Sequence, residues 1–462
     1  MHRKVYILMK KFSILLLLLA LAWHWHLYLS AAHRPEPEEH AADYAVPTFV
    51  SDSPIKALSH YTKEQPASNA PLLEWSEDLN AVYYQLELFG GDLPPDLAAG
   101  QISPQHIFFT QQVYTHAYQI DLKQIAPKYL NGTPLYWRVR SMDIDGNPIT
   151  DFSAPEPLYA LDTPSPMRSP LPHVTYNSGN GTVLLYPVYS YVLNAGATQF
   201  EVEVTDAPPE NPNGIEPSVH RIYSAIVTGG EHYDPEPRIG TYYWRVRGLD
   251  DDGKPVGVYC DAQMYRNEPG DDWQIAVFGD SISHGGGHLS FGPADWAYSY
   301  AYYLDFPTIN LSFSGDTSAT AVERFDRDVL PFHPRFLLIM TGTNSLRAGV
   351  PADSVIDDLK KLQLKCRRNG ITPILLTLAP INPDNIKKVF DQGTSADWQE
   401  NFDEVNDFIR TQPHIDAAAA LNSPPVLPDY YAMDGLHGDV EAKKIYARAI
   451  NENISQFIKA KQ

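Results

Sequence analysis

A segment of thirteen residues occurs twice in this chain of 462 residues and constrains its fold more than any other feature. Residues 136–148 (YWRVRSMDIDGNP) and 243–255 (YWRVRGLDDDGKP) are identical at nine of thirteen positions. Repetition at a domain-sized interval indicates a duplicated structural module. In both copies Tyr-Trp-Arg-Val-Arg alternates large apolar with long basic side chains, which predicts a half-buried β-strand. The Asp-Gly that follows predicts a turn.

Further strands are predicted upstream of each copy, at residues 71–75, 84–88, 183–187 and 200–204. Together these features resemble fibronectin type III or related immunoglobulin-like sandwiches. We therefore expect two all-β sandwich modules, at 66–163 and 164–268. We expect the repeated Trp137 and Trp244 to fill the module cores and not to bind carbohydrate from the surface. The economical hypothesis is that the modules are spacers or docking units.

Near Asp271 the pattern changes to alternating strands and helices, which is typical of a parallel α/β domain. We expect this α/β/α domain to occupy residues 269–462. Its predicted strands are 274–278, 307–311, 335–340 and 371–378, and its predicted helices are 352–368, 397–411 and 440–459. In such sheets, ligands bind beyond the carboxyl ends of the strands.

Four short motifs lie in this last third of the chain: GDSIS at 279–283, SGD at 314–316, GTN at 342–344 and DGLH at 434–437. Each of the first three follows a predicted strand, so all three reach the same edge of the sheet. Ser281 is the candidate nucleophile. His437 is the candidate base, because Asp434 three residues earlier can hold its imidazole in one tautomer. This set of residues predicts acyl transfer.

The order and local contexts of these motifs resemble the SGNH (GDSL-type) hydrolase family over roughly residues 270–460. The resemblance implies hydrolysis of carboxylic esters through an acyl-enzyme, with no metal and no cofactor. It also implies an oxyanion hole made by the backbone amides of Ser281 and Gly315 and the side-chain amide of Asn344. Ser345 stands where many family members carry an aspartate, which affects only the support of Asn344.

Two other groups of residues invite different hypotheses. His284 and His288 flank three glycines, but no nearby acid or cysteine completes a metal site, so we expect none there. Cys260 and Cys366 fall in different predicted domains. They could form a disulfide, but we expect two free buried thiols.

The N-terminus predicts export. Basic residues precede an apolar run at 12–23, and small residues suited to signal-peptidase cleavage follow near residue 31. Residues 1–32 are either a signal peptide or an uncleaved anchor, with residues 12–29 as a membrane tether. A polar linker is predicted at 33–65. No cysteine directly follows the apolar run, which argues against a lipoprotein anchor. The formal net charge of −21 argues against nucleic acid as a partner.

The sequence thus predicts an exported serine esterase that is secreted, periplasmic or anchored outside the cytoplasmic membrane. Its expected substrate is a small ester or an acylated extracellular or cell-wall glycan. Two alternatives stay open. One is a lipid-directed acylhydrolase, because residues 314–318 resemble the thioesterase and lysophospholipase branch of the family. The other is a surface adhesion protein with a non-catalytic hydrolase domain. The sequence does not determine the oligomeric state.

Overall fold

The structure, a computed structural model, describes residues 55–90, 100–173, 180–287, 291–422 and 425–459. The predicted signal or anchor at 1–32 lies outside the described residues. Within the described ranges, no helix combines the length and the apolar character needed to cross a membrane. Of the predicted linker at 33–65, the described residues begin at Ile55, which is buried among apolar residues of the first module, and Ala57 forms a β-bridge with Trp75.

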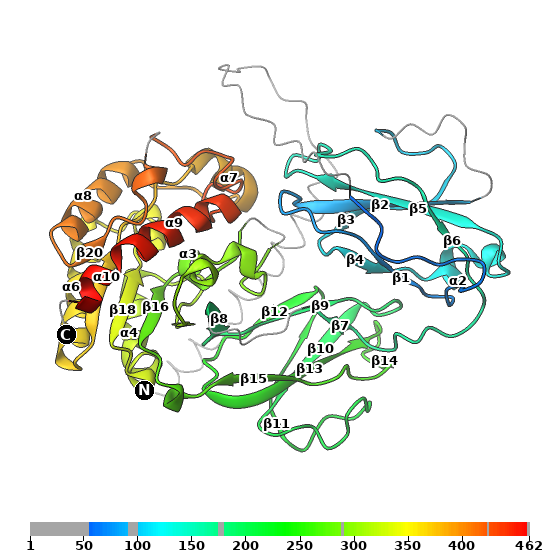
Figure 1. Ribbon diagram of the computed structural model, residues 1–462, viewed down its shortest axis with the longest axis horizontal. Helices are drawn as coiled ribbons and strands as arrows, with labels where there is room; N and C mark the ends of the chain where they lie inside the picture. Colours follow the sequence, from blue (N-terminus) through cyan, green and yellow to red (C-terminus); the bar gives the residue numbers. More distant parts are fainter. Residues whose placement is uncertain (1–54, 91–99, 174–179, 288–290, 423–424, 460–462) are drawn as a thin grey trace, which may run out of the picture. The chain divides into compact units, whose positions relative to one another are not determined.

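The first module consists of antiparallel strands (Figure 1). One sheet has the order β3-β2-β5-β6, with β2 at Tyr83–Gly90, β3 at His106–Val113, β5 at Leu135–Met142 and β6 at Glu156–Leu158. The other pairs β1 (Leu72–Glu74) with β4 (Ala117–Gln119). Trp137 is fully buried among the apolar side chains of this module.

The second module is also built of antiparallel strands. One sheet has the order β11-β10-β13-β14, and β15 pairs with β13; these strands are β10 (Gln199–Thr205), β11 (Arg221–Val227), β13 (Gly240–Leu249), β14 (Pro255–Val256) and β15 (Gln263–Asn267). The other joins β12 (Glu231–Tyr233), β9 (Val188–Val192) and β7 (Leu171–Pro172). Trp244 is fully buried in its core. The prediction that the repeated tryptophans fill the module cores is therefore confirmed.

The repeated arginines differ from the prediction of a half-buried strand. Arg138 and Arg245 are both buried. Each lies opposite a glutamate in the neighbouring strand's register, and the Nε–Oε2 distances are 2.5 Å for Arg138–Glu87 and for Arg245–Glu203. Because the pairing neutralises each charge, both the arginine and the glutamate can be removed from water. The prediction of a half-buried strand was therefore wrong for Arg138 and Arg245.

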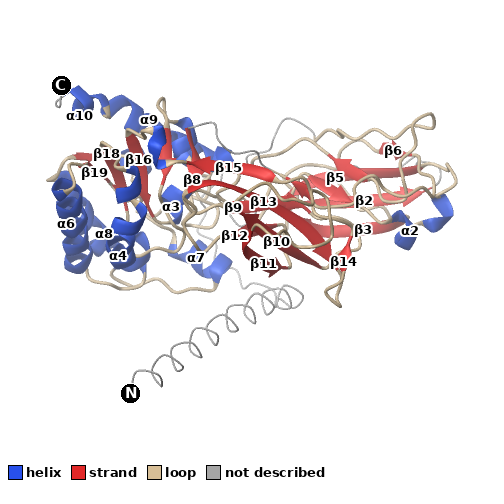
Figure 2. Cartoon of the chain, turned by 90° about the horizontal axis from the view of Figure 1, so that it is seen from below, coloured by secondary structure: helices blue, strands red, loops and turns tan. Residues whose placement is uncertain are grey.

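A parallel six-stranded sheet forms the core of the C-terminal domain, which confirms the predicted α/β class. Its order is β20-β19-β18-β16-β17-β8, with β16 at Ile275–Gly279, β17 at Thr308–Asn310, β18 at Phe336–Met340, β19 at Thr372–Leu376 and β20 at His414–Ile415. Helices α4 (Ser318–Asp328), α6 (Ala352–Arg368) and α8 (Trp398–Arg410) lie on one side of the sheet, and α9 (Val440–Asn453) lies on the other (Figure 2). The predicted helix at 440–459 is divided into α9 and α10 (Ser455–Lys459).

The sixth strand, β8 (Asn180–Leu184), comes from the segment predicted to belong to the second sandwich. It pairs in parallel with β17, with Ile309 opposite Val183. Val183 and Leu185 are buried in the core of the C-terminal domain, whereas Leu184 is buried in the core of the second module. One strand is therefore shared between two cores. The hypothesis that both modules are mere spacers is wrong for the second, because it supplies an edge strand of the parallel sheet.

Both cysteines are free and buried, as expected. Cys260 belongs to the core of the second module, and Cys366 belongs to the core of the C-terminal domain.

Candidate active site

The candidate nucleophile lies directly after the central strand β16. A Cβ on Gly279, the last residue of that strand, would clash with the carbonyl oxygen of Met340, so the turn requires glycine. The Asp280 side chain caps the short helix α3 (Ser281–His284) by accepting a hydrogen bond from the Ile282 N–H at 3.1 Å. This local geometry places Ser281 at the carboxyl edge of the sheet.

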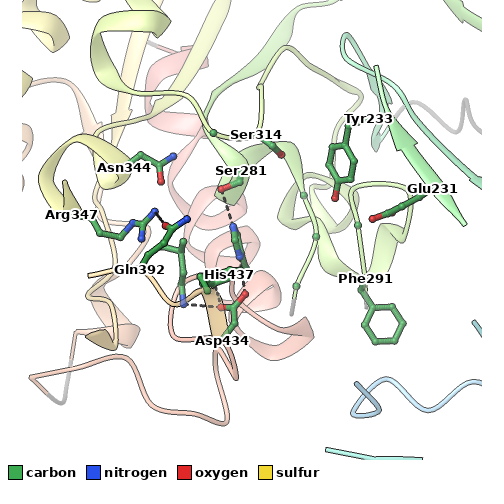
Figure 3. A pocket seen from close by; sticks show the side chains of 17 residues that line it. Glu231, Tyr233, Ser281, Phe291, Ser314, Asn344, Arg347, Gln392, Asp434 and His437 are labelled. Atoms are coloured by element: carbon green, nitrogen blue, oxygen red, sulfur yellow. Dashed lines mark hydrogen bonds and ion pairs between the residues drawn. The ribbon is translucent and has the colours of Figure 1, made fainter. Parts of the chain in front are cut away.

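Ser281, His437 and Asp434 form a continuous chain of hydrogen bonds (Figure 3). The distance from Ser281 Oγ to His437 Nε2 is 2.9 Å, and that from His437 Nδ1 to Asp434 Oδ2 is 2.8 Å. Asp434 is fully buried, and its Oδ1 accepts the backbone N–H groups of Leu436 and His437. Since the carboxylate accepts a hydrogen bond from Nδ1–H, Nε2 carries no proton and is left to accept the proton of the Ser281 hydroxyl.

Gly315 and Asn344, the predicted oxyanion donors, line the same pocket as Ser281. Gly315 has a φ of +88°, a conformation that favours glycine. The Asn344 side chain lies in α5 (Thr343–Arg347), and its Nδ2 donates to the Asp316 carbonyl at 2.9 Å. An amide nitrogen carries two protons, so this bond fixes the side chain and leaves one proton for a ligand.

Ser345, the residue that departs from the family pattern, is buried next to Asn344. Its Oγ accepts the backbone N–H of Ser318 at 3.0 Å. It thereby joins α5 to the start of α4, where Ser318 Oγ donates to Asp358 Oδ2 at 2.8 Å.

Arg324, which the sequence analysis did not single out, connects the nucleophile strand to the loop of Gly315. Its Nη2 donates to the Gly279 carbonyl at 3.0 Å, its Nη1 donates to the Leu311 carbonyl at 2.6 Å, and its Nε pairs with Asp316. A buried cation of this kind positions the loops that carry the site.

His284 serves the structure of the pocket wall. Its Nε2 donates to the Tyr186 carbonyl and its Nδ1 accepts from Ser314 Oγ, both at 2.8 Å. Burial lowers the pKa of this imidazole to about 4, so it is neutral. Both ring nitrogens are therefore engaged by protein groups. His288 lies outside the described residues.

The pocket has a volume of about 350 Å³. Arg347 and Gln392 lie on one side of Ser281, and Tyr233 and Glu231 lie on the other (Figure 3). Arg347 Nη2 donates to Gln392 Oε1 at 2.8 Å. Sequence reasoning missed all four residues. None belongs to one of the four motifs, and two of them come from β12 of the second module.

A parallel α/β sheet that carries serine, histidine and aspartate in one hydrogen-bonded chain is an arrangement used by serine hydrolases. Residues 277–445 match the sequence profile of the GDSL-like lipase/acylhydrolase family. Residues 277–445, which carry Ser281, Asp434 and His437, are a GDSL-like lipase/acylhydrolase domain.

A curated relative is the uncharacterized lipoprotein YqeF of Bacillus subtilis (strain 168), which is 29% identical over 144 residues. The match covers 29% of this chain and 56% of the relative, so the chain spans about half the length of that protein.

Three solved structures are similar to the C-terminal part. The GDSL-like lipase of Bacteroides thetaiotaomicron is 18% identical, with 41% of this chain and 90% of that chain covered and a TM-score of 0.33. The lipase/acylhydrolase of Enterococcus faecalis is 20% identical, with 40% and 96% covered and a TM-score of 0.32. The psychrotrophic esterase EstA of Pseudoalteromonas is 19% identical, with 40% and 98% covered and a TM-score of 0.32.

Proposed function

We propose that this protein is an exported serine esterase that removes acetyl or other short acyl groups from an extracellular or cell-wall glycan. The observation that carries the proposal is the hydrogen-bonded chain from Ser281 through His437 to Asp434, in a pocket that also holds Gly315 and Asn344.

In the proposed mechanism, His437 Nε2 takes the proton of Ser281 as Oγ attacks the ester carbonyl carbon. The backbone N–H groups of Ser281 and Gly315 and the Asn344 amide donate to the oxyanion. Collapse breaks the bond to the alcohol oxygen, which receives the proton from His437. Water then attacks the acyl carbon while His437 takes its proton. The bond from the acyl carbon to Ser281 Oγ breaks, His437 returns the proton to Oγ, and the carboxylic acid leaves.

The dimensions and lining of the pocket support a short acyl group. A long acyl chain needs a continuous apolar surface that buries most of it. In a volume of about 350 Å³, the large apolar side chains among the lining residues are Phe291, Phe390 and Leu436, and they are interspersed with glycines and charged groups. These three apolar residues are also the ones that a longer acyl chain would contact. The competing hypothesis is therefore a lipid ester, and the experiment below distinguishes it from the glycan ester.

Export rests on the basic and apolar N-terminal segment at 1–32. The name of the Bacillus relative, a lipoprotein, supports an extracytoplasmic location at a membrane, although no cysteine stands directly after the apolar run of this chain. We propose that residues 66–163 and 164–268 are two fibronectin III-like modules before a hydrolase domain at 269–462. The antiparallel sheets and the repeated Glu–Arg pairs support that duplication.

The test is a series of nitrophenyl esters from acetyl to octanoyl, run beside an acetylated polysaccharide. We expect kcat/KM to be highest for acetyl or another short ester. If kcat/KM rises steadily through octanoyl, the lipid hypothesis replaces the glycan one, since each buried methylene would contribute about 0.8 kcal/mol.

The catalytic assignment has its own test. Ser281→Ala and His437→Ala should each abolish nearly all turnover, and the double variant should lose no more than either alone, because the two side chains act as a unit. Ser354→Ala, which alters an exposed serine on α6, is the control. Substantial turnover by Ser281→Ala would refute the assignment.

A further inference from the structure

Strand β12 of the second module contributes two polar side chains to the hydrolase pocket. Glu231 and Tyr233 are two residues apart, so their side chains leave the same face of the strand. Both line the pocket of Ser281, on the side away from Arg347 (Figure 3). The antiparallel pairing of β12 with β9 fixes this register, with Tyr233 opposite Val188.

The two polar tips converge on one point of the pocket wall. A Cβ added to Gly292 would lie 2.5 Å from Glu231 Oε2 and 3.0 Å from the Tyr233 hydroxyl oxygen. Glycine at this position therefore leaves room for a carboxylate and a phenol to lie side by side. The glycines that form the wall allow a strand of another module to approach the nucleophile closely.

The carboxylate of Glu231 faces the pocket with its acceptor capacity unused. Among the described residues, neither the Glu231 carboxylate nor the Tyr233 hydroxyl takes part in a hydrogen bond with the protein. Burial and the nearby Asp295 raise the pKa of the Glu231 carboxyl to about 7, while His173, which lies 3.3 Å from Asp295, opposes this shift. A half-buried acceptor pair of this kind gains most from a ligand that donates hydrogen bonds.

We propose that Glu231 and Tyr233 form a subsite that binds hydroxyl groups of a sugar in the alcohol part of the ester. This inference rests on the proposed function and assigns recognition of the glycan to these two side chains. The carboxylate accepts a sugar hydroxyl, and the phenol both donates and accepts, which matches the dense donors and acceptors of a polyol. An apolar alcohol would cover both groups without satisfying them, and would bind less well for that reason.

The experiment compares an acetylated xylo-oligosaccharide with 4-nitrophenyl acetate, using the full chain. Glu231→Ala and Tyr233→Phe should lower kcat/KM for the oligosaccharide, by about 10- to 100-fold for the carboxylate because hydrogen bonds to charged groups contribute most. Nitrophenyl acetate has no sugar hydroxyl that these two side chains could bind, so its kcat/KM should change little. The ratio of the two kcat/KM values should therefore shift at least tenfold against the oligosaccharide. Glu236→Ala, an exposed glutamate of the same module, is the matched control.

The variant Gly292→Ala tests the same subsite without changing Glu231 or Tyr233. Its φ is not in the left-handed region, and its new Cβ would displace the Glu231 carboxylate without changing any charge. We expect the same shift in the substrate ratio. If Glu231→Ala fails to fold, Gly292→Ala and Glu231→Gln still test the subsite.

Each of the other outcomes overturns the proposal. An equal loss on both substrates would make the two residues structural, and no loss on either would make them irrelevant to the alcohol part. A wild-type preference for acetylcholine that Glu231→Ala removes would assign the subsite to a cationic alcohol. If the wild type hydrolyses neither ester, the proposed function itself fails. If the wild type hydrolyses both esters and the variants leave the ratio of the two kcat/KM values unchanged, only the subsite proposal fails.

Discussion

At the scale of single residues, two buried ionisable side chains, those of Asp280 and Lys443, lie next to the short helix that begins with Ser281. Asp280 Oδ1 caps α3, but Oδ2 is buried and has no hydrogen-bond partner in the described part of the chain. Lys443 is fully buried and its Nζ donates to the Ile282 carbonyl at 3.2 Å. Burial raises the pKa of Asp280 to about 7 and lowers that of Lys443 to about 8. The residue that caps α3 is therefore a carboxyl group that burial disfavours in its charged form.

Asp280→Asn should change the pH dependence of stability. The Asp280 pKa is about 7 in the folded chain, above its ordinary value of 3.8. Between these values the folded state retains a proton that the unfolded state has released, so the wild type loses stability as pH rises through the window. Asparagine keeps the capping oxygen and does not titrate. The Tm of the variant relative to the wild type should therefore rise from about pH 4 to pH 7.

Thermal unfolding between pH 4.5 and pH 8 measures this difference. Asp403→Asn, which changes an exposed carboxyl group on α8, is the control. A Tm difference between Asp280→Asn and the wild type that does not vary with pH would contradict the prediction.

Asn344→Ala should lower kcat by about 10²- to 10³-fold with little change in KM, because the lost donor acts on the oxyanion and not on the ground-state ester. The variant also loses the hydrogen bond to the Asp316 carbonyl, which contributes about 1 kcal/mol to stability. Steady-state kinetics on nitrophenyl acetate, with Tm measured in parallel, separate the two effects. A loss confined to KM would argue that Asn344 binds substrate and does not stabilise the transition state.

At the scale of elements, β8 ties the second module to the hydrolase. Tyr186, two residues beyond the strand, is buried in the hydrolase core, and its hydroxyl donates to Asp328 Oδ2 at 2.6 Å. Its carbonyl accepts the Nε2 proton of His284. The segment that follows β8 thus supplies both an apolar side chain and hydrogen-bond partners to the domain that carries Ser281.

A fragment that begins at residue 271 should therefore be insoluble or much less stable than the full chain. It lacks β8, exposes the edge of β17, and leaves Asp328 and His284 without partners from this segment. A fragment that begins at residue 164 retains them and should fold with esterase activity. Solubility, Tm and turnover of nitrophenyl acetate compare the two fragments. Equal stability and activity of the shorter one would show that β8 is dispensable.

The elements that sequence predicted best are those with local signals at both ends. Helix α6 spans the predicted residues 352–368 because Asn369-Gly370 ends it, with Gly370 at a φ of +74°. The role of β8 was not predictable, since Val183, Leu184 and Leu185 are apolar towards both faces and suit either of two sheets. The first three motifs predicted that Ser281, Gly315 and Asn344 lie near one another, because the carboxyl ends of parallel strands meet at one edge of the sheet. Glu231 lines the site because of the register in which β12 pairs with β9. No local sequence pattern predicts that register.

At the scale of the whole molecule, the duplication extends to the buried charges. Arg138 pairs with Glu87 and Arg245 with Glu203, and the next arginines bind Gln85 and Glu201 on the same strands. Removing one partner of a buried pair leaves an uncompensated charge, which destabilises a protein by about 3–5 kcal/mol. The two copies therefore form a matched pair of sites, one in each module, for testing which module supports the hydrolase.

Arg138→Met and Arg245→Met should have unequal effects on the temperature at which esterase activity is lost. Because β8 is shared between the second module and the hydrolase sheet, Arg245→Met should lower that temperature together with the main calorimetric transition. Arg138→Met should lower the transition of the first module and leave most activity in place, since its strands belong to a separate sheet. Scanning calorimetry with activity measured after heating distinguishes the two variants. An equal decrease in both would mean that the two modules and the hydrolase unfold as one unit, and that the first module also supports the site.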